Sequence, residues 1–72
     1  MTLPAPARAV ITLHDAAGRL VRTLASGEFE AGPHVIAWDG RDEAGRDCAS
    51  GLYFARARAA RWSGVARILR VR

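Results

Sequence analysis

The sequence predicts a small all-β domain of antiparallel strands. Short segments alternate between apolar and polar residues, and clusters of Gly, Pro, Asp and Ser separate most of them. Both features are typical of strands joined by tight turns. At 72 residues the chain is long enough for one domain. A domain of that length buries only about 60% of its unfolded surface, so we expect a thin core.

Two prolines stiffen the N-terminal segment, which reads Thr2-Leu3-Pro4-Ala5-Pro6. Each proline fixes its own φ and disfavours the helical conformation of the residue before it. We therefore expect residues 1–7 to be an extended linker stub and residues 8–72 to form the domain.

Alternation first becomes clear at Ala9, Ile11 and Leu13, which share one face of the segment 9–14. This spacing is typical of a half-buried strand. By the same reasoning we expect five strands, over residues 9–14, 19–25, 33–38, 52–59 and 65–71.

Two of these segments depart from a simple strand pattern. Leu20, Val21 and Leu24 break strict alternation in the segment 19–25, which indicates a β-bulge. The segment 55–60 is rich in Ala and Arg, which favour helix by intrinsic propensity. Its residues nevertheless continue the alternation that begins at Tyr53, so we favour a strand.

Three connections follow from turn-forming residues. We expect a loop bracketed by glycines at 27–32, a polar loop at 39–47 and a hairpin turn at Trp62-Ser63-Gly64.

A short repeat gives the strongest local signal. Asp15-Ala16-Ala17-Gly18-Arg19 returns as Asp42-Glu43-Ala44-Gly45-Arg46. Asp can accept backbone N–H groups ahead of it, and Gly supplies a positive φ. The repeat therefore predicts two type I turns, each followed by a glycine bulge, at Asp15 to Gly18 and at Asp42 to Gly45.

Charge is unevenly distributed along the chain. Residues 1–55 hold five Arg against seven Asp and Glu, a net of −2, whereas residues 56–72 hold six Arg and no acid, a net of +6. Such a basic end can bind nucleic acid, and Trp62 among these arginines could stack on bases. The alternative is a solvated face of two strands, and we favour it.

The sequence gives little support for a metal, cofactor or catalytic site. His14 and His34 lack a third ligand, and Asp39, Asp42, Glu43 and Asp47 lack the spacing of an EF-hand. We expect no metal site, no cofactor site and no catalytic residue, since no nucleophile motif or phosphate-binding loop is present. Cys48 is the single cysteine, so no internal disulfide can form.

Two stretches carry a resemblance to a known family. They are residues 13–24, and residues 32–42 together with Gly45-Arg46 and residues 50–54. The order of a hairpin, Trp38-Asp39-Gly40, a turn, Ser50-Gly51-Leu52-Tyr53 and a basic last strand resembles the FlgD-type immunoglobulin-like domain. That domain is named after the flagellar hook-capping protein and also occurs at the C-terminus of secreted bacterial proteins. The pattern is related to the C-terminal sorting domains of type IX secretion.

The resemblance implies an immunoglobulin-like antiparallel β-sandwich of about five to six strands. Family members often carry a further upstream strand, which we expect this chain to lack. His14 stands where an aromatic residue is common, and Arg70 and Arg72 stand where sorting domains tend to show Lys. Five alternating segments agree with a sandwich. We expect its core to contain Ile11, Leu13, Ile36, Trp38, Tyr53, Leu69 and Val71.

Three functions are compatible with the sequence. We favour a non-catalytic accessory module at the C-terminus of a secreted or cell-surface bacterial protein, serving export recognition, surface attachment or spacing. The alternatives are a scaffold domain in flagellar hook assembly, which makes protein–protein contacts, and a basic nucleic-acid-binding module. The expected partners are domains of the parent protein or the secretion or surface machinery.

An open sheet edge could also accept a strand or cause self-association. We expect no specific nucleic acid and no membrane insertion, because no apolar run approaches the roughly 20 residues of a membrane helix. The chain shows no signal peptide, so an extracellular location would depend on a longer exported parent.

Overall fold

The computed structural model describes residues 1–71, which form six strands and no helix. The strands are β1 (Thr2–Leu3), β2 (Ala7–Asp15), β3 (Leu20–Phe29), β4 (Gly32–Pro33), β5 (Gly51–Ala59) and β6 (Trp62–Arg70). Every pairing is antiparallel. The predicted all-β class is confirmed, and the segment that helix propensity favours lies in β5.

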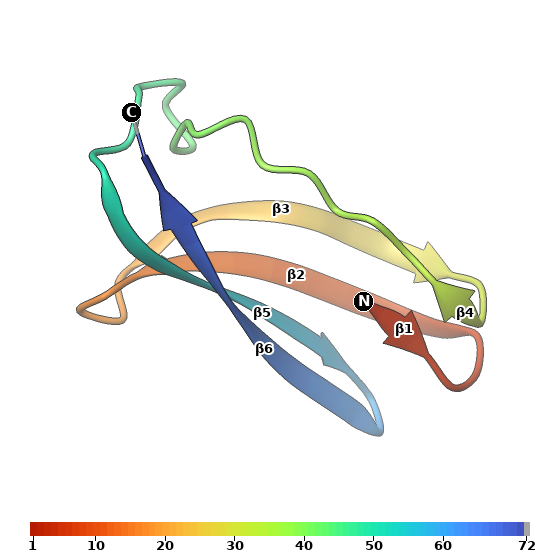
Figure 1. Cartoon of the computed structure of the whole chain (residues 1–72). Coiled ribbons are helices and arrows are strands. Elements are labelled where there is room, and N and C mark those ends of the chain that lie inside the picture. The colour runs from red at the N-terminus through yellow and green to blue at the C-terminus, as the bar shows by residue number, and fades with distance from the viewer. Residues whose placement is uncertain (72) are drawn as a thin grey trace.

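The strands form a curved main sheet and a small second layer (Figure 1). The main sheet has the order β3-β2-β5-β6, and β1 pairs with β4 in a separate two-stranded sheet. After β4 the chain crosses the main sheet as an extended segment to the polar loop 39–47 (Figure 1). We call residues 34–39 the crossing segment. The N-terminal residues, expected as a linker stub, contribute β1 to this second layer.

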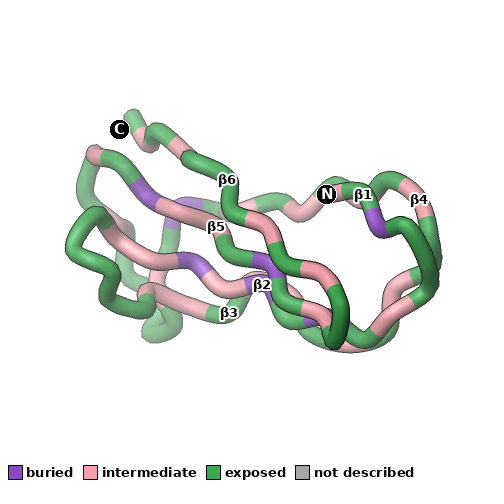
Figure 2. The backbone as a smooth tube through the Cα atoms, turned by 90° about the horizontal axis from the view of Figure 1, so that it is seen from below, coloured by how far each residue is buried: buried purple, intermediate pink, exposed green. Residues whose placement is uncertain are grey.

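The core lies between the two layers and is small. Its buried residues are Leu3, Ala9, Ile11, Leu13, Tyr53 and Ala57 (Figure 2). Along β2 they fall at every second position, because successive side chains of a strand point to opposite faces. The second layer can pack close to the main sheet, because the side chains of Ala9 and Ala57 are small.

Two expected core residues are exposed instead. Leu69 is 72% exposed and Val71 is 78% exposed, so their assignment to the inner face is wrong. The register between β5 and β6 gives the reason: Ile68 lies opposite the buried Tyr53, whereas Leu69 lies opposite Leu52. Ile68 therefore occupies the inner face, and Leu69 the outer face.

The expected strand over residues 33–38 is also shorter than predicted. The strand β4 covers only Gly32–Pro33, and the pairing ends at His34, which exchanges backbone hydrogen bonds with Met1. Beyond His34 the crossing segment alternates without joining a ladder: Ile36 and Trp38 are half-buried, and Val35 is 96% exposed. Ile36 and Trp38 thus cover the core from above and are not enclosed within it.

The structure confirms the predicted irregularity of β3. Leu24 is the extra residue between the pairs Ile11–Ala25 and Thr12–Thr23, and Val21 is the extra residue between the next two pairs. These register shifts explain why apolar residues are adjacent in the sequence. The predicted start of the loop at 27–32, by contrast, is wrong, because β3 continues through Gly27 to Phe29.

The hairpin turn between β5 and β6 lies two residues earlier than predicted. Ala59 pairs with Trp62, so Ala60 and Arg61 form the turn. The indole of Trp62 lies over Gly64, where an added Cβ would be 3.2 Å from the ring. Gly64 therefore has a packing role that the sequence could not distinguish from a turn role.

The repeated motif forms the same turn twice. In each copy the Asp carbonyl accepts the Gly N–H, and the Asp carboxylate accepts the N–H groups two and four residues ahead. Gly18 has φ 88° and Gly45 has φ 82°, as the repeat predicts. The first copy joins β2 to β3. The second closes only the isolated bridge between Arg41 and Asp47.

Candidate functional site

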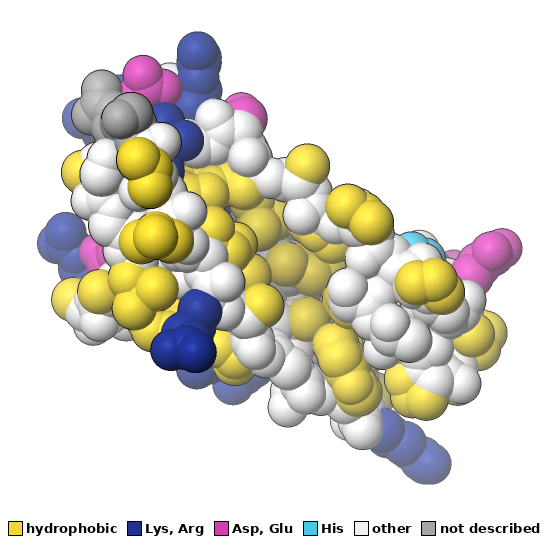
Figure 3. Space-filling view, in the orientation of Figure 1, with side chains coloured by type: hydrophobic (Ala, Val, Ile, Leu, Met, Phe, Trp, Pro, Cys, Tyr) yellow, Lys and Arg dark blue, Asp and Glu magenta, His cyan; other side chains and the backbone are white. Residues whose placement is uncertain are grey.

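An apolar groove lies on the inner face of β5 and β6. It has a volume of about 410 Å³ and a mostly apolar lining. In Figure 3 it is the hydrophobic hollow near the centre of the molecule. Its lining consists of Met1, Ile11, Ile36, Ala55, Ala57, Trp62, Gly64, Val65, Ala66 and Ile68.

The groove exists because the second layer is narrower than the main sheet. Met1 and Ile36 stand on the second-layer side, and both pack against the core cluster. Trp62 and Ile68 stand on β6, at the far edge of the sheet. Small residues of β5, Ala55 and Ala57, form a low floor between these rims. We did not predict the groove, although the alternate alanines of β5 were the available signal.

The opposite, outer face of β5 and β6 is basic. Alternation places Arg56 and Arg58 of β5 and Arg67 of β6 on this face, and neither strand contains an acid. Within residues 1–71, the ion pairs all involve other arginines, namely Arg19, Arg22, Arg41 and Arg46. The outer face of these two strands thus carries exposed cations without ion-pair partners among the described residues, together with the exposed apolar side chains of Leu52, Val65 and Leu69.

Two members of the basic end do not join this face. Arg70 turns inward, where its Nε donates to the carbonyl of Cys48 at 3.0 Å. Trp62 also faces inward over Gly64. The alternative interpretation, in which Trp62 stands among the arginines on one surface, is therefore not supported. Arg72 lies outside the described residues.

Trp38 and Tyr53 anchor the loop end of the domain. Their rings are 4.9 Å apart at an interplanar angle of 58°. The Trp38 indole N–H donates to the Arg41 carbonyl at 2.9 Å, and the Tyr53 hydroxyl donates to the Ala49 carbonyl at 2.7 Å. The Tyr53 bond is similar to the tyrosine corner of immunoglobulin-like domains, in which a hydroxyl bonds backbone a few residues upstream.

Cys48 lies half-buried beside this cluster. Burial raises the pKa of its thiol, and the nearby carboxylate of Asp42 raises that pKa further. A thiol with a raised pKa is a weaker nucleophile at neutral pH, because less thiolate is present. The position of Cys48 is that of a structural residue.

The two histidines form hydrogen bonds with different partners and do not share a site. His14 bonds Thr12 Oγ1 at 2.9 Å and the Gly18 carbonyl at 3.3 Å. His34 bonds the Glu30 carbonyl and packs edge-on against Phe29. Across residues 1–71, no three His, Cys, Asp or Glu gather in a way that could hold a metal ion.

The acids of the polar loop serve the loop itself. Asp39 accepts from the Arg41 N–H at 2.9 Å and from the Arg22 guanidinium at 3.2 Å. Glu43 accepts from the Thr23 N–H at 3.3 Å, and Asp42 forms the repeated turn. These contacts hold the polar loop against β3.

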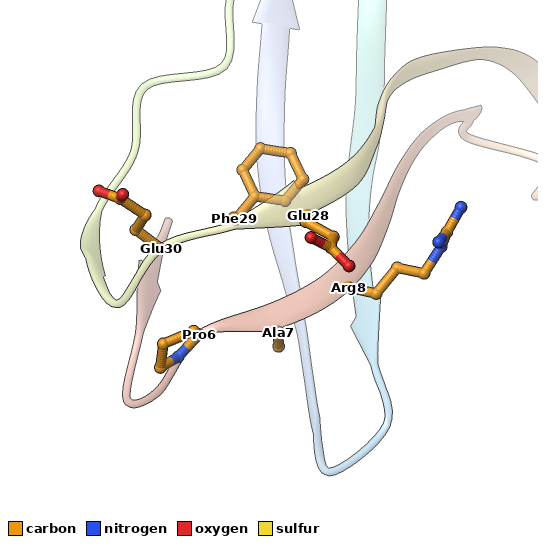
Figure 4. Close-up of a pocket in the computed structure, with 6 residues that line it drawn as sticks. All are labelled: Pro6, Ala7, Arg8, Glu28, Phe29 and Glu30. Atoms are coloured by element: carbon orange, nitrogen blue, oxygen red, sulfur yellow. The ribbon is translucent and has the colours of Figure 1, made fainter.

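A second hollow lies where β2 begins and β3 ends (Figure 4). It measures about 520 Å³ and is lined by Pro6, Ala7, Arg8, Glu28, Phe29 and Glu30. Arg8 and Glu28 are opposite each other in the register of the two strands. The described residues contain no helix that is long and apolar enough to span a membrane.

Comparison with known proteins agrees with the fold. The family description "FlgD Ig-like domain" matches residues 1–63, which is most of the chain. Two relatives, both named basal-body rod modification protein FlgD, come from Salmonella typhimurium and Salmonella typhi. Each is 45% identical over 42 residues, and the match covers 58% of this chain and 18% of the relative. No solved structure matches significantly. The matched family and the antiparallel fold together show that this chain belongs to the FlgD immunoglobulin-like domain family.

Proposed function

We propose that this chain is a non-catalytic protein-interaction module that acts as a scaffold domain in flagellar assembly. The observation that carries the interaction role is the apolar groove, which leaves Trp62 and Ile68 beside a surface with no covering layer. Contiguous apolar hollows on small domains are typical sites of protein contact. The flagellar assignment rests on the relatives, whose name refers to the basal-body rod.

A non-enzymatic role is supported by what the titratable groups do. The described histidines bond to backbone or neighbouring side chains, and the acids of the polar loop are used to build turns. Cys48 has a raised pKa, which opposes nucleophilic chemistry. Each group thus has a structural task.

The accessory role in a secreted or cell-surface protein has less support. It follows from the resemblance to C-terminal modules of secreted proteins, and no contact of the described residues favours it over the flagellar role. Export of the parent protein is common to both proposals. Recognition by the sorting machinery belongs to the accessory role alone.

The test compares two neighbouring positions of β6. Ile68→Glu places a charge in the groove, whereas Leu69→Glu places the same charge on the outer face, where Leu69 is already exposed. Each substitution would be introduced into the native gene, and hook assembly would be scored by electron microscopy and motility. We expect Ile68→Glu to block assembly and Leu69→Glu to permit it.

Circular dichroism of both purified variants checks that they fold. Normal hooks after deletion of the whole chain would show that the flagellar role is wrong. Normal hooks with a folded Ile68→Glu variant would show that the groove is not the contact surface.

A further inference from the structure

The outer edge of β6 is a continuous, unprotected strand edge. β6 pairs with β5 over nine residues without a register shift, and it has no other neighbour in the sheet. In residues 62–70 no backbone group bonds to anything except β5 within the described chain. A row of free N–H and C=O groups of this kind is a template for another strand.

The other edge of the sheet is protected. β3 carries the two bulges at Val21 and Leu24, which interrupt a regular edge. The Glu43 carboxylate also accepts the N–H of Thr23, and Arg22 is bonded to Asp39 of the polar loop. An added strand would therefore form a regular ladder with β6 and not with β3.

A strand added to β6 would have two different surroundings. On the inner face, alternate side chains would extend the apolar groove beside Trp62 and Ile68. On the outer face, they would stand next to Arg67 and next to the exposed side chains of Val65 and Leu69, which flank Arg67 on β6. Arg56 and Arg58 lie one strand further away, opposite Val65 and Ser63, which are short enough for long Arg side chains to extend across.

We propose that β6 is a strand-addition site for an extended segment of a partner protein in which acidic and apolar residues alternate. Backbone pairing supplies affinity, and the two faces supply specificity: carboxylates for the exposed arginines, and apolar side chains for the groove. This proposal deepens the protein-interaction role and rests on it, but it does not depend on the flagellar assignment.

The charge pattern opposes the other occupants. A second copy of β6 would bring further arginines and no acid to the same edge. Nucleic acid would gain phosphate contacts at Arg56, Arg58 and Arg67, but Trp62 lies on the opposite face of the sheet, so it does not add base stacking to these contacts. An acidic, extended peptide satisfies both faces and the edge.

The first test uses capped nine-residue peptides, the length of β6. One peptide alternates Val and Glu, and its control alternates Val and Lys. We expect calorimetry to show at least about tenfold tighter binding of the Glu peptide, weakening as salt is added. In NMR spectra, alternate β6 amides should become protected from exchange when the Glu peptide binds. Equal binding of both peptides, or protection outside β6, would overturn the proposal.

The second test separates backbone pairing from charge attraction. Two versions of the Glu peptide carry N-methyl groups on odd or on even residues, so each removes the donors of one peptide edge. Strand addition requires that one version bind and that the other fail, because only one edge faces β6. If both bind, or if neither does, strand addition is wrong.

Matched charge reversals locate the site. Arg67→Glu should weaken the Glu peptide at least about tenfold, whereas Arg8→Glu, the same charge change on β2, should alter binding by less than about twofold. Equal losses would indicate a general attraction of anions and overturn the proposal. Sedimentation that shows a dimer through β6, or a single-stranded oligonucleotide that binds more tightly than the Glu peptide at physiological salt, would assign the edge to a different occupant and also overturn it.

Discussion

The guanidinium of Arg70 lies over the indole ring of Trp38, 5.6 Å from the ring centroid. Arg70 belongs to the last strand, and Trp38 to the end of the crossing segment. Arg70 also donates to the Cys48 carbonyl, so one side chain ties the end of β6 to both ends of the polar loop. The contacts of Arg70 thus add to the packing of Trp38 on Tyr53 at the loop end of the domain.

Arg70→Ala should lower the free energy of unfolding by about 1–2 kcal/mol, because it removes a cation–π contact and a hydrogen bond to a carbonyl. Urea denaturation measures the change. Arg67→Ala is the control, since Arg67 is exposed on the outer face, and it should cost less than about 0.5 kcal/mol. Equal costs would contradict the assigned role of Arg70.

Gly40 should tolerate substitution less well than Gly18. Both have positive φ, so Ala is strained at either position by about 1–2 kcal/mol. A Cβ at Gly40 would also collide with the Arg70 guanidinium, whereas nothing lies within 4 Å of one at Gly18. Gly40→Ala should therefore cost at least about 1 kcal/mol more than Gly18→Ala.

A double-mutant cycle tests the reason for this difference. In the Arg70→Ala background the collision is gone, so Gly40→Ala should cost less than it does in the native chain. If the costs of the two substitutions simply add, the strain of Gly40→Ala comes from its backbone conformation alone.

Trp38 should contribute to stability through its ring and, separately, through its N–H. Trp38→Phe keeps an aromatic ring against Tyr53 but loses the bond to Arg41, and should cost about 1 kcal/mol. Trp38→Ala should cost about 2–4 kcal/mol, which is below the usual cost for a fully buried aromatic residue because Trp38 is half-buried. Denaturant unfolding distinguishes the two. A Trp38→Ala variant as stable as Trp38→Phe would rule out the ring contact.

Lowering the pH should destabilise the turn at Asp15 to Gly18, because the Asp15 carboxylate becomes protonated. The backbone hydrogen bond from Arg19 holds the pKa of the Asp15 carboxyl below its ordinary value of 3.8. A lowered folded-state pKa stabilises the fold above the unfolded value, and this contribution is lost as pH falls through the folded value. Asp15→Asn keeps an acceptor but cannot titrate.

The stability difference between the native chain and Asp15→Asn should thus be largest near neutral pH and shrink in acid. Urea denaturation over a pH series measures it. A difference that stays constant down through the acid range would show that Asp15 does not titrate in the turn.

Cys48 should react slowly with iodoacetamide in the folded chain. Burial raises the pKa of its thiol, so little thiolate is present near neutral pH. Mass spectrometry should show alkylation at least about tenfold faster when urea unfolds the chain. A free peptide spanning residues 45–51 serves as the control for urea itself. Equal rates in the folded chain and in the peptide would contradict the burial of Cys48.

Local features of this protein follow from the sequence by itself. The turns at Asp15 and Asp42 are built from bonds between residues no more than four positions apart, so the five-residue motif carries all the atoms that they need. The alternation of β2 likewise places Ile11 and Leu13 together on one face, and these residues are buried. The irregular spacing of Leu20, Val21 and Leu24 predicts the disturbance of β3 for the same local reason.

Only the tertiary structure decides the faces of β6 and the extent of the second layer. Ile68 and Leu69 are adjacent and equally apolar, so either could face inward, and the register with Tyr53 selects Ile68. The crossing segment has strand-like alternation, but it finds only the short β1 as a partner. The groove results from the register between β5 and β6 together with the short second layer. A strand is completed by hydrogen bonds to a neighbour distant in sequence, and no local pattern specifies which neighbour is present or in which register it pairs.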